Sequence, residues 1–71
     1  MNEPIYNLQG QIQAAFLNDR DMQDYGIEVL DNNGIITLRG TVPSHAARDR
    51  AEALVREMDG VMSVINELDV I

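Results

Sequence analysis

Three aspartates lie close together ahead of the first strand-like run, at Asp19, Asp21 and Asp24, and Glu28 follows shortly after. Carboxylate oxygens gathered in a loop are the ligands that a hard cation such as Ca²⁺ prefers. The spacing departs from an EF-hand, because counting from Asp19 places Asp24 where that loop needs glycine and Leu30 where it needs glutamate. The three aspartates are therefore candidates for a weak cation site, and the alternative interpretation is a solvated acidic loop.

The single histidine, His45, directly follows Ser44. A general base needs a nucleophile or a second carboxylate within hydrogen-bond reach, and consecutive side chains rarely point at each other. Ser44 is better suited to cap a helix. The sequence also contains no P-loop, no dinucleotide-binding fingerprint and no ligand set at zinc spacing. We therefore expect no catalytic residues, no cofactor and no enzyme activity.

Charge and length narrow the class of protein further. The chain has 71 residues, a net charge of −7, no cysteine, and only arginine among its five basic residues. This balance excludes nucleic acid as a partner and disfavours capture by an anionic membrane surface. No apolar run approaches the roughly 18 residues of a membrane span, and the first four residues lack the basic start of a signal peptide. We expect a single domain, residues 1–71, that is cytoplasmic as given, or periplasmic if it is a module of a longer exported protein.

The candidate residues must be positioned by a β-hairpin over residues 27–42. Two alternating, β-branched runs flank Asn33-Gly34, and this dipeptide suits a type I′ turn because both central residues need positive φ. Counting back from the turn pairs Glu28 with Arg39 on one face. The other face carries the residues expected in the core, namely Ile27, Val29, Ile36, Leu38 and Val42.

Two helices are predicted on either side of this hairpin. The first runs over residues 4–18, with Asn2 or Glu3 as the cap before Pro4 and an apolar face formed by Ile5, Leu8, Ile12, Ala15 and Phe16. Residues 19–26 lack a period and are expected to form a polar loop. The second helix begins after Ser44, ends with Gly60 as its C′ residue, and has an apolar stripe of Ala47, Ala51, Leu54, Val55 and Met58.

A final strand is predicted over residues 61–71. Its apolar face comprises Met62, Val64, Leu68 and Val70. Asn66 falls on the same face, and we expect its side chain to bond to backbone at a sheet end or bulge.

The resulting order, αββαβ, predicts an α+β fold with a three-stranded mixed sheet and two helices packed on one face. We expect Gly40, on the inner face, to let a helix approach the sheet closely. The other face stays bare and displays four residues as a candidate interaction surface: Leu30, Ile35, Thr37 and Ile65. The alternative is that these are scattered surface residues of no consequence.

The run from Asn33 to Ser44, then Ala51-Glu52-Ala53, then Gly60-Val61 with Val64, Asn66, Leu68 and Val70, resembles the BON domain, named after bacterial OsmY and nodulation proteins. The resemblance covers about residues 8–71 and implies an αββαβ fold. It further implies a non-catalytic binding module of osmotic-stress proteins, secretins, channels and haemolysin-like proteins. Attachment to phospholipid is the role it suggests, and one architecture of the family senses potassium.

These observations lead to two hypotheses of function. The first is a small non-catalytic interaction module in a stress or envelope setting, acting through a protein partner, self-association or phospholipid. Net charge disfavours the phospholipid. The second is a module that responds to potassium or calcium through the acidic loop of residues 19–24.

Overall fold

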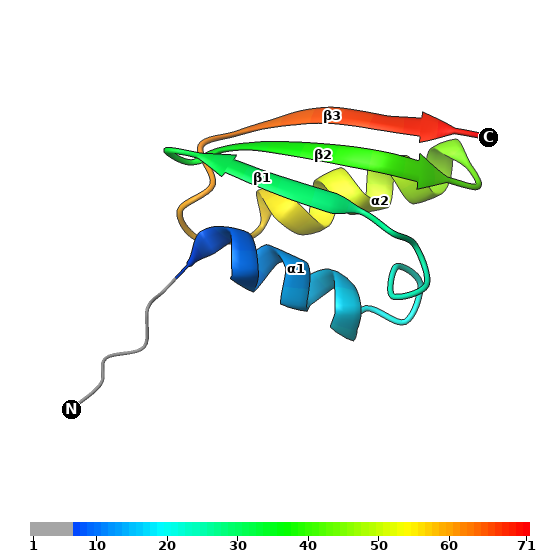
Figure 1. The fold of residues 1–71 in the computed structure, drawn as a ribbon, viewed down its shortest axis with the longest axis horizontal. Helices are drawn as coiled ribbons and strands as arrows, with labels where there is room; N and C mark the ends of the chain where they lie inside the picture. The colour runs from blue at the N-terminus through cyan, green and yellow to red at the C-terminus, as the bar shows by residue number, and fades with distance from the viewer. Residues whose placement is uncertain (1–6) are drawn as a thin grey trace.

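The chain folds as a three-stranded sheet covered on one side by two helices. A computed structural model describes residues 7–71. The elements in chain order are α1 (Leu8–Asn18), β1 (Glu28–Asn32), β2 (Ile35–Val42), α2 (His45–Arg56) and β3 (Ser63–Val70). The strands lie in the order β1-β2-β3, with β1 antiparallel and β3 parallel to β2. Both helices lie against the same face of the sheet (Figure 1). The predicted α+β architecture is therefore confirmed.

The hairpin adopts the predicted register, with Glu28 opposite Arg39 and Asn32 opposite Ile35. At the turn, Asn33 has φ 54° and Gly34 has φ 92°, as a type I′ turn requires. Asp31 Oδ1 accepts a hydrogen bond from the Gly34 N–H at 2.9 Å, which holds the turn from within the hairpin. The register thus follows from the turn chemistry, as the sequence indicated.

The hydrophobic core fills the space between the helices and the sheet. Its buried side chains are Ile12, Phe16, Met22, Val29, Ile36, Leu38, Val42, Ala47, Ala51, Val55 and Leu68. Every member except Met22 belongs to an apolar face that the sequence predicts. Neither helix among residues 7–71 has the length and apolar character needed to cross a bilayer.

The first helix begins later than predicted. α1 starts at Leu8, because Asn7 has extended backbone angles and its side chain accepts a hydrogen bond from the Gly10 N–H at 3.1 Å. Asparagine is a strong N-cap, so the helix begins after Asn7 and not at Pro4. Pro4, its capping candidates Asn2 and Glu3, and Ile5 lie outside the described residues.

The second helix ends earlier than predicted. α2 is capped by Ser44, whose hydroxyl accepts from the Ala47 N–H at 3.1 Å, and it stops at Arg56 instead of continuing to Gly60. The Met58 N–H donates to the Val55 carbonyl at 3.0 Å, a bond that spans three residues instead of the four of an α-helix and closes the last turn. Gly60 does have a positive φ of 94°, but it serves the turn that leads into β3.

Two further expectations about the sheet were wrong. Met62 was expected on the apolar face of the last strand. It lies before β3, where its N–H bonds to the Gly34 carbonyl at 2.8 Å, and its side chain is 80% exposed. The second expectation was that a helix approaches Gly40, but the segment that approaches Gly40 is the loop before β1. A Cβ at Gly40, where φ is 136°, would lie 2.7 Å from the Gly26 carbonyl oxygen. The backbone of the loop therefore occupies the space that a side chain would need.

Candidate functional site

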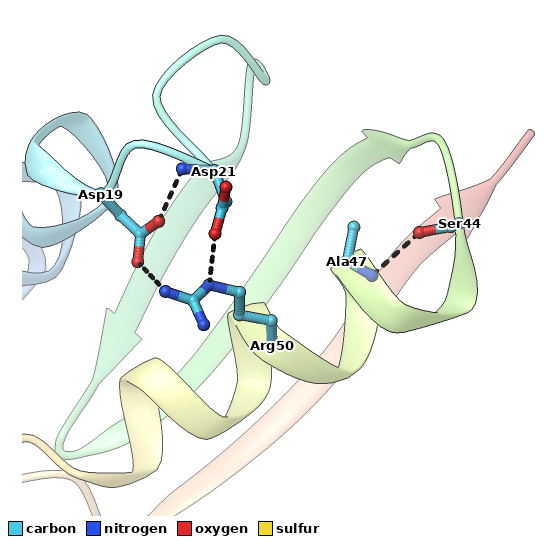
Figure 2. A network of polar contacts seen from close by, with 5 residues as sticks. All are labelled: Asp19, Asp21, Ser44, Ala47 and Arg50. Carbon is cyan, nitrogen blue, oxygen red and sulfur yellow. Dashed lines mark hydrogen bonds and ion pairs between the residues drawn. The ribbon is translucent and has the colours of Figure 1, made fainter.

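The acidic loop is held by an arginine from α2. Arg50 NH2 lies 3.0 Å from Asp19 Oδ2, and its Nε lies 3.6 Å from Asp21 Oδ2 (Figure 2). The other oxygen of Asp19 accepts from the Asp21 N–H at 2.8 Å, and the Asp19 side chain is only 9% exposed. Two of the three candidate cation ligands therefore face a guanidinium, while Asp24 is exposed.

The electrostatics of Asp19 follow from these contacts. The hydrogen bond from the Asp21 N–H lowers the pKa of the Asp19 carboxyl, and Arg50 lowers this pKa further against the opposing effect of burial. Among residues 7–71, no group of three or more His, Cys, Asp or Glu side chains is placed to hold a metal ion. The geometry gives the loop a structural partner in Arg50.

The loop also supplies a core residue that the sequence interpretation missed. Met22 is 1% exposed and packs in the hydrophobic core, with Tyr25 partly buried against it. The N–H groups of Met22 and Gln23 both bond to the Asp19 carbonyl, at 3.0 and 2.8 Å, so the chain turns tightly after Asp19. Two apolar residues three positions apart in an otherwise polar loop were the available signal for this turn.

Two hollows of about 280 Å³ each flank this turn. One lies between the end of α1 and the loop, and the other lies between the loop and α2, where Arg50 is already paired with the aspartates. Pockets for small molecules usually enclose about 300–1,000 Å³. Both hollows lie at the lower end of this range.

Ser44 and His45 lie at the start of α2. The Ser44 hydroxyl is used as the cap of α2, accepting from the Ala47 N–H at 3.1 Å (Figure 2). His45 is the exposed first residue of α2. The structure therefore gives Ser44 the role that the sequence favoured for it.

The open face of the sheet brings together the four candidate interaction residues. Leu30 pairs with Thr37 and Thr37 pairs with Ile65, so these three form one row across all three strands. Ile35 lies in the neighbouring row. The exposed fractions are 36% for Leu30, 41% for Ile35 and 45% for Ile65, and Thr37 is partly buried. We refer to Leu30, Ile35, Thr37 and Ile65 together as the apolar patch.

A charged row borders the apolar patch on the side away from the hairpin turn. Glu28 pairs with Arg39, and Arg39 pairs with Glu67 across the parallel ladder. Arg39 Nε lies 3.0 Å from Glu67 Oε1, and both side chains are about half exposed, at 57% and 49%. Such an exposed pair contributes little to stability, so its main effect is on the surface that the sheet presents.

Comparison with known proteins identifies the family. A model of the BON domain matches residues 7–71 of the chain. The chain belongs to the BON domain family. It is similar to Osmotically-inducible protein Y of Escherichia coli strain K12, with 40% identity over 58 residues. The match covers 82% of this chain and 29% of that relative, so this BON domain spans less than a third of the relative's length. The resemblance predicted for residues 8–71 is confirmed.

Asn66, one of the residues that carried the resemblance, fastens β3 of this BON domain to α2. Its Nδ2 donates to the Arg48 carbonyl at 3.1 Å and to Glu52 Oε1 at 3.2 Å, and Arg48 NH2 donates back to the Asn66 carbonyl at 3.3 Å. We expected bonding to backbone at a sheet end or bulge. The bonding to backbone is present, but Asn66 lies within β3, opposite Leu38. The helix above it supplies the partners, which strand periodicity does not reveal.

Both edges of the sheet in this BON domain have backbone groups covered by side chains. On β3, Asn66 Oδ1 accepts from the Leu68 N–H at 3.1 Å, and Arg48 occupies the Asn66 carbonyl. On β1, Gln9 Oε1 from α1 accepts from the Asp31 N–H at 3.2 Å. An edge strand recruits another strand through unpaired backbone groups, so these contacts disfavour strand addition.

Proposed function

We propose that this BON domain is a non-catalytic interaction module that binds another protein through the open face of its sheet. The observation that carries the proposal is the row of Leu30, Thr37 and Ile65 on the face that both helices leave uncovered. Contiguous exposed apolar side chains often mark a binding surface. The name of the Escherichia coli relative supports a setting in the response to osmotic stress.

Three observations favour the open face over other parts of the molecule. In the acidic loop, Asp19 and Asp21 already form ion pairs with Arg50. One backbone N–H of β1, and one N–H and one carbonyl of β3, are bonded to side chains at the sheet edges. The hollows beside Met22 are small. In the apolar patch, exposed apolar side chains from all three strands lie in neighbouring rows, and this arrangement is what the proposal depends on.

The charge of the chain favours a protein over a phospholipid as the partner. At a net charge of −7, approach to an anionic bilayer is repulsive, and so is the approach of a second copy. The cation-responsive alternative is less favoured, because Arg50 lies 3.0 Å from Asp19 and 3.6 Å from Asp21 and already balances one of their two negative charges. Self-association and lipid attachment are outcomes that the experiment below distinguishes.

The test is photocrosslinking in cells. It compares a double variant with aspartates in the apolar patch with a double variant with aspartates outside the patch. A photoreactive amino acid at position 37 reports contacts in cells after an increase in osmotic strength. We expect a discrete crosslinked protein that is lost with Ile35→Asp and Ile65→Asp together. It should persist with Leu17→Asp and Ala53→Asp together, which change two exposed apolar residues on α1 and α2.

Three results would overturn the proposal. The first is crosslinking that is the same in both double variants. The second is a dimeric mass by light scattering that falls to the monomer only with the Ile35 and Ile65 changes, which would make a second copy the occupant. The third is flotation of the wild-type protein with anionic vesicles that the same changes abolish.

A further inference from the structure

The open face is divided into an apolar zone and an acidic zone. The apolar patch lies near the hairpin turn, and the row Glu28–Arg39–Glu67 lies beyond it. Arg39 neutralises one carboxylate of this row through its 3.0 Å contact with Glu67, which leaves an excess of one negative charge. Asp69, two residues further along β3 on the same face, adds a second. A partner therefore meets apolar side chains and an unbalanced negative charge together.

The size of the face limits the occupant to a single segment of chain. Neighbouring strands lie about 4.8 Å apart, so the outer strands of a three-stranded sheet are separated by about 10 Å. This width matches the diameter of one α-helix, about 10–12 Å with its side chains. One helix or one extended peptide therefore covers the width of the face.

The spacing between the two zones fixes the pattern that the segment must carry. Ile65 and Glu67 are two residues apart on one strand, and so are Leu30 and Glu28, which places the two rows about 7 Å apart. Residues i and i+2 of an extended segment have this separation, and residues i and i+4 of a helix are about 6 Å apart. An apolar residue followed at either spacing by lysine or arginine would complement both rows.

We infer that the open face binds a basic amphipathic segment of a partner protein. An apolar side chain of the segment packs on the row of Leu30, Thr37 and Ile65, and a lysine or arginine lies beside Glu28 or Glu67. The inference rests on the proposed function and adds the chemistry of the partner. Because the chain itself carries a charge of −7, a basic segment is also attracted from a distance, while an acidic competitor is repelled.

The experiment uses synthetic peptides of known composition as probes. The first, the leucine–lysine peptide, repeats Leu-Ser-Lys-Ser, so that lysine follows leucine at position i+2 on the same face of an extended segment. The second, the leucine–glutamate peptide, repeats Leu-Ser-Glu-Ser, and the third repeats Ser-Ser-Lys-Ser. Binding is measured by calorimetry and located by shifts of backbone amide resonances. We expect the leucine–lysine peptide to bind and to shift amides of the open face, and the other two to bind at least tenfold more weakly.

Two variants with the same change in net charge distinguish binding at the apolar patch from nonspecific electrostatic attraction of the peptide. Ile65→Glu adds a negative charge within the apolar patch, and Leu17→Glu adds one on α1, where Leu17 is 66% exposed. Net charge alone predicts that both variants bind the leucine–lysine peptide more tightly. We expect Ile65→Glu to weaken binding about tenfold, because it removes apolar contact area, and Leu17→Glu to leave it unchanged.

The acidic row is tested by Glu28→Gln and Glu67→Gln. Each should weaken binding about twofold to fivefold and reduce its dependence on salt, as expected for an exposed charge pair. Equal binding by Ile65→Glu and Leu17→Glu would overturn the inference. Tight binding of the leucine–glutamate peptide at the open face would also overturn it, while leaving the proposed interaction surface intact. Failure of the crosslinking experiment would instead remove the proposed function itself.

Discussion

Two connections flank β1, and they are built by different means. The turn at Asn33-Gly34, which leads out of β1, has the backbone angles that its two residues favour and a cap from Asp31 in the same hairpin. The loop of residues 19–26, which leads into β1, depends on Arg50 from α2 and on burial of Met22 between the helices and the sheet. Local chemistry specifies the turn, whereas distant partners specify the loop. Substitutions in the two connections should therefore lower the free energy of unfolding for different reasons.

The largest effect is expected at Met22. Met22→Ala removes a fully buried side chain from the core and should lower the free energy of unfolding by about 2–5 kcal/mol. Urea denaturation followed by circular dichroism measures the change. Leu17→Ala, at a position 66% exposed, is the matched control and should cost under about 0.5 kcal/mol. Equal losses in the two variants would mean that the loop does not enter the core.

The turn should be most sensitive at Gly34. Gly34→Ala must adopt φ 92°, and its Cβ would lie 3.0 Å from both the Gly60 carbonyl oxygen and Met62 Cγ. We expect a loss of about 1–3 kcal/mol from backbone strain and crowding. The same denaturation measurement, with Gly26→Ala as control, checks it, because a Cβ at Gly26 meets nothing within 4 Å. A Gly34→Ala protein as stable as the Gly26→Ala protein would show that the turn tolerates a side chain.

A smaller effect is expected at the other turn residue. Asn33 has φ 54°, a left-handed conformation that asparagine tolerates better than most residues. Asn33→Ala should cost about 1 kcal/mol, and Asn33→Gly should be close to neutral. Thermal unfolding of the two variants side by side measures the difference. If glycine is as destabilising as alanine, the Asn33 side chain matters through its contacts instead of through backbone conformation.

The smallest effect at neutral pH is expected at Asp19, and it should appear as a change in pH dependence. The pKa of Asp19 is lowered in the folded state below its ordinary value of 3.8, chiefly by the Asp21 N–H and then by Arg50. Its stabilising contribution is therefore fully present above about pH 4 and is lost as the pH falls through the lowered pKa. Asp19→Asn should be less stable than the wild type at pH 7, and the gap should narrow toward pH 2.

Denaturation at a series of pH values measures this gap. Arg20→Gln, which changes the charge at an exposed neighbouring position, is the control and should leave the acid dependence as it is in the wild type. Arg50→Gln should raise the pKa of Asp19 and weaken the acid dependence in part, because the bond from the Asp21 N–H remains. A gap between Asp19→Asn and the wild type that stays constant with pH would contradict the assignment.

The sequence by itself determined the hairpin, its register, both helical faces and the order αββαβ. Each of these depends on residues that are close together in the chain: alternating side chains beside Asn33-Gly34, and apolar residues three and four positions apart. The open face could be predicted for the same reason, because Leu30, Ile35 and Ile65 must point away from a sheet whose other side is needed by two helices.

Only the tertiary structure decided where isolated residues of the loops would go. Met22 is buried because α1, α2 and the sheet leave a space that no periodic pattern records. Arg50, which is 31 residues away in sequence, pairs with Asp19 and joins the acidic loop to α2. Gly40 is required because the Gly26 carbonyl approaches it across the fold. Contacts between distant segments form only when the chain has folded, so neighbouring residues carry no record of them.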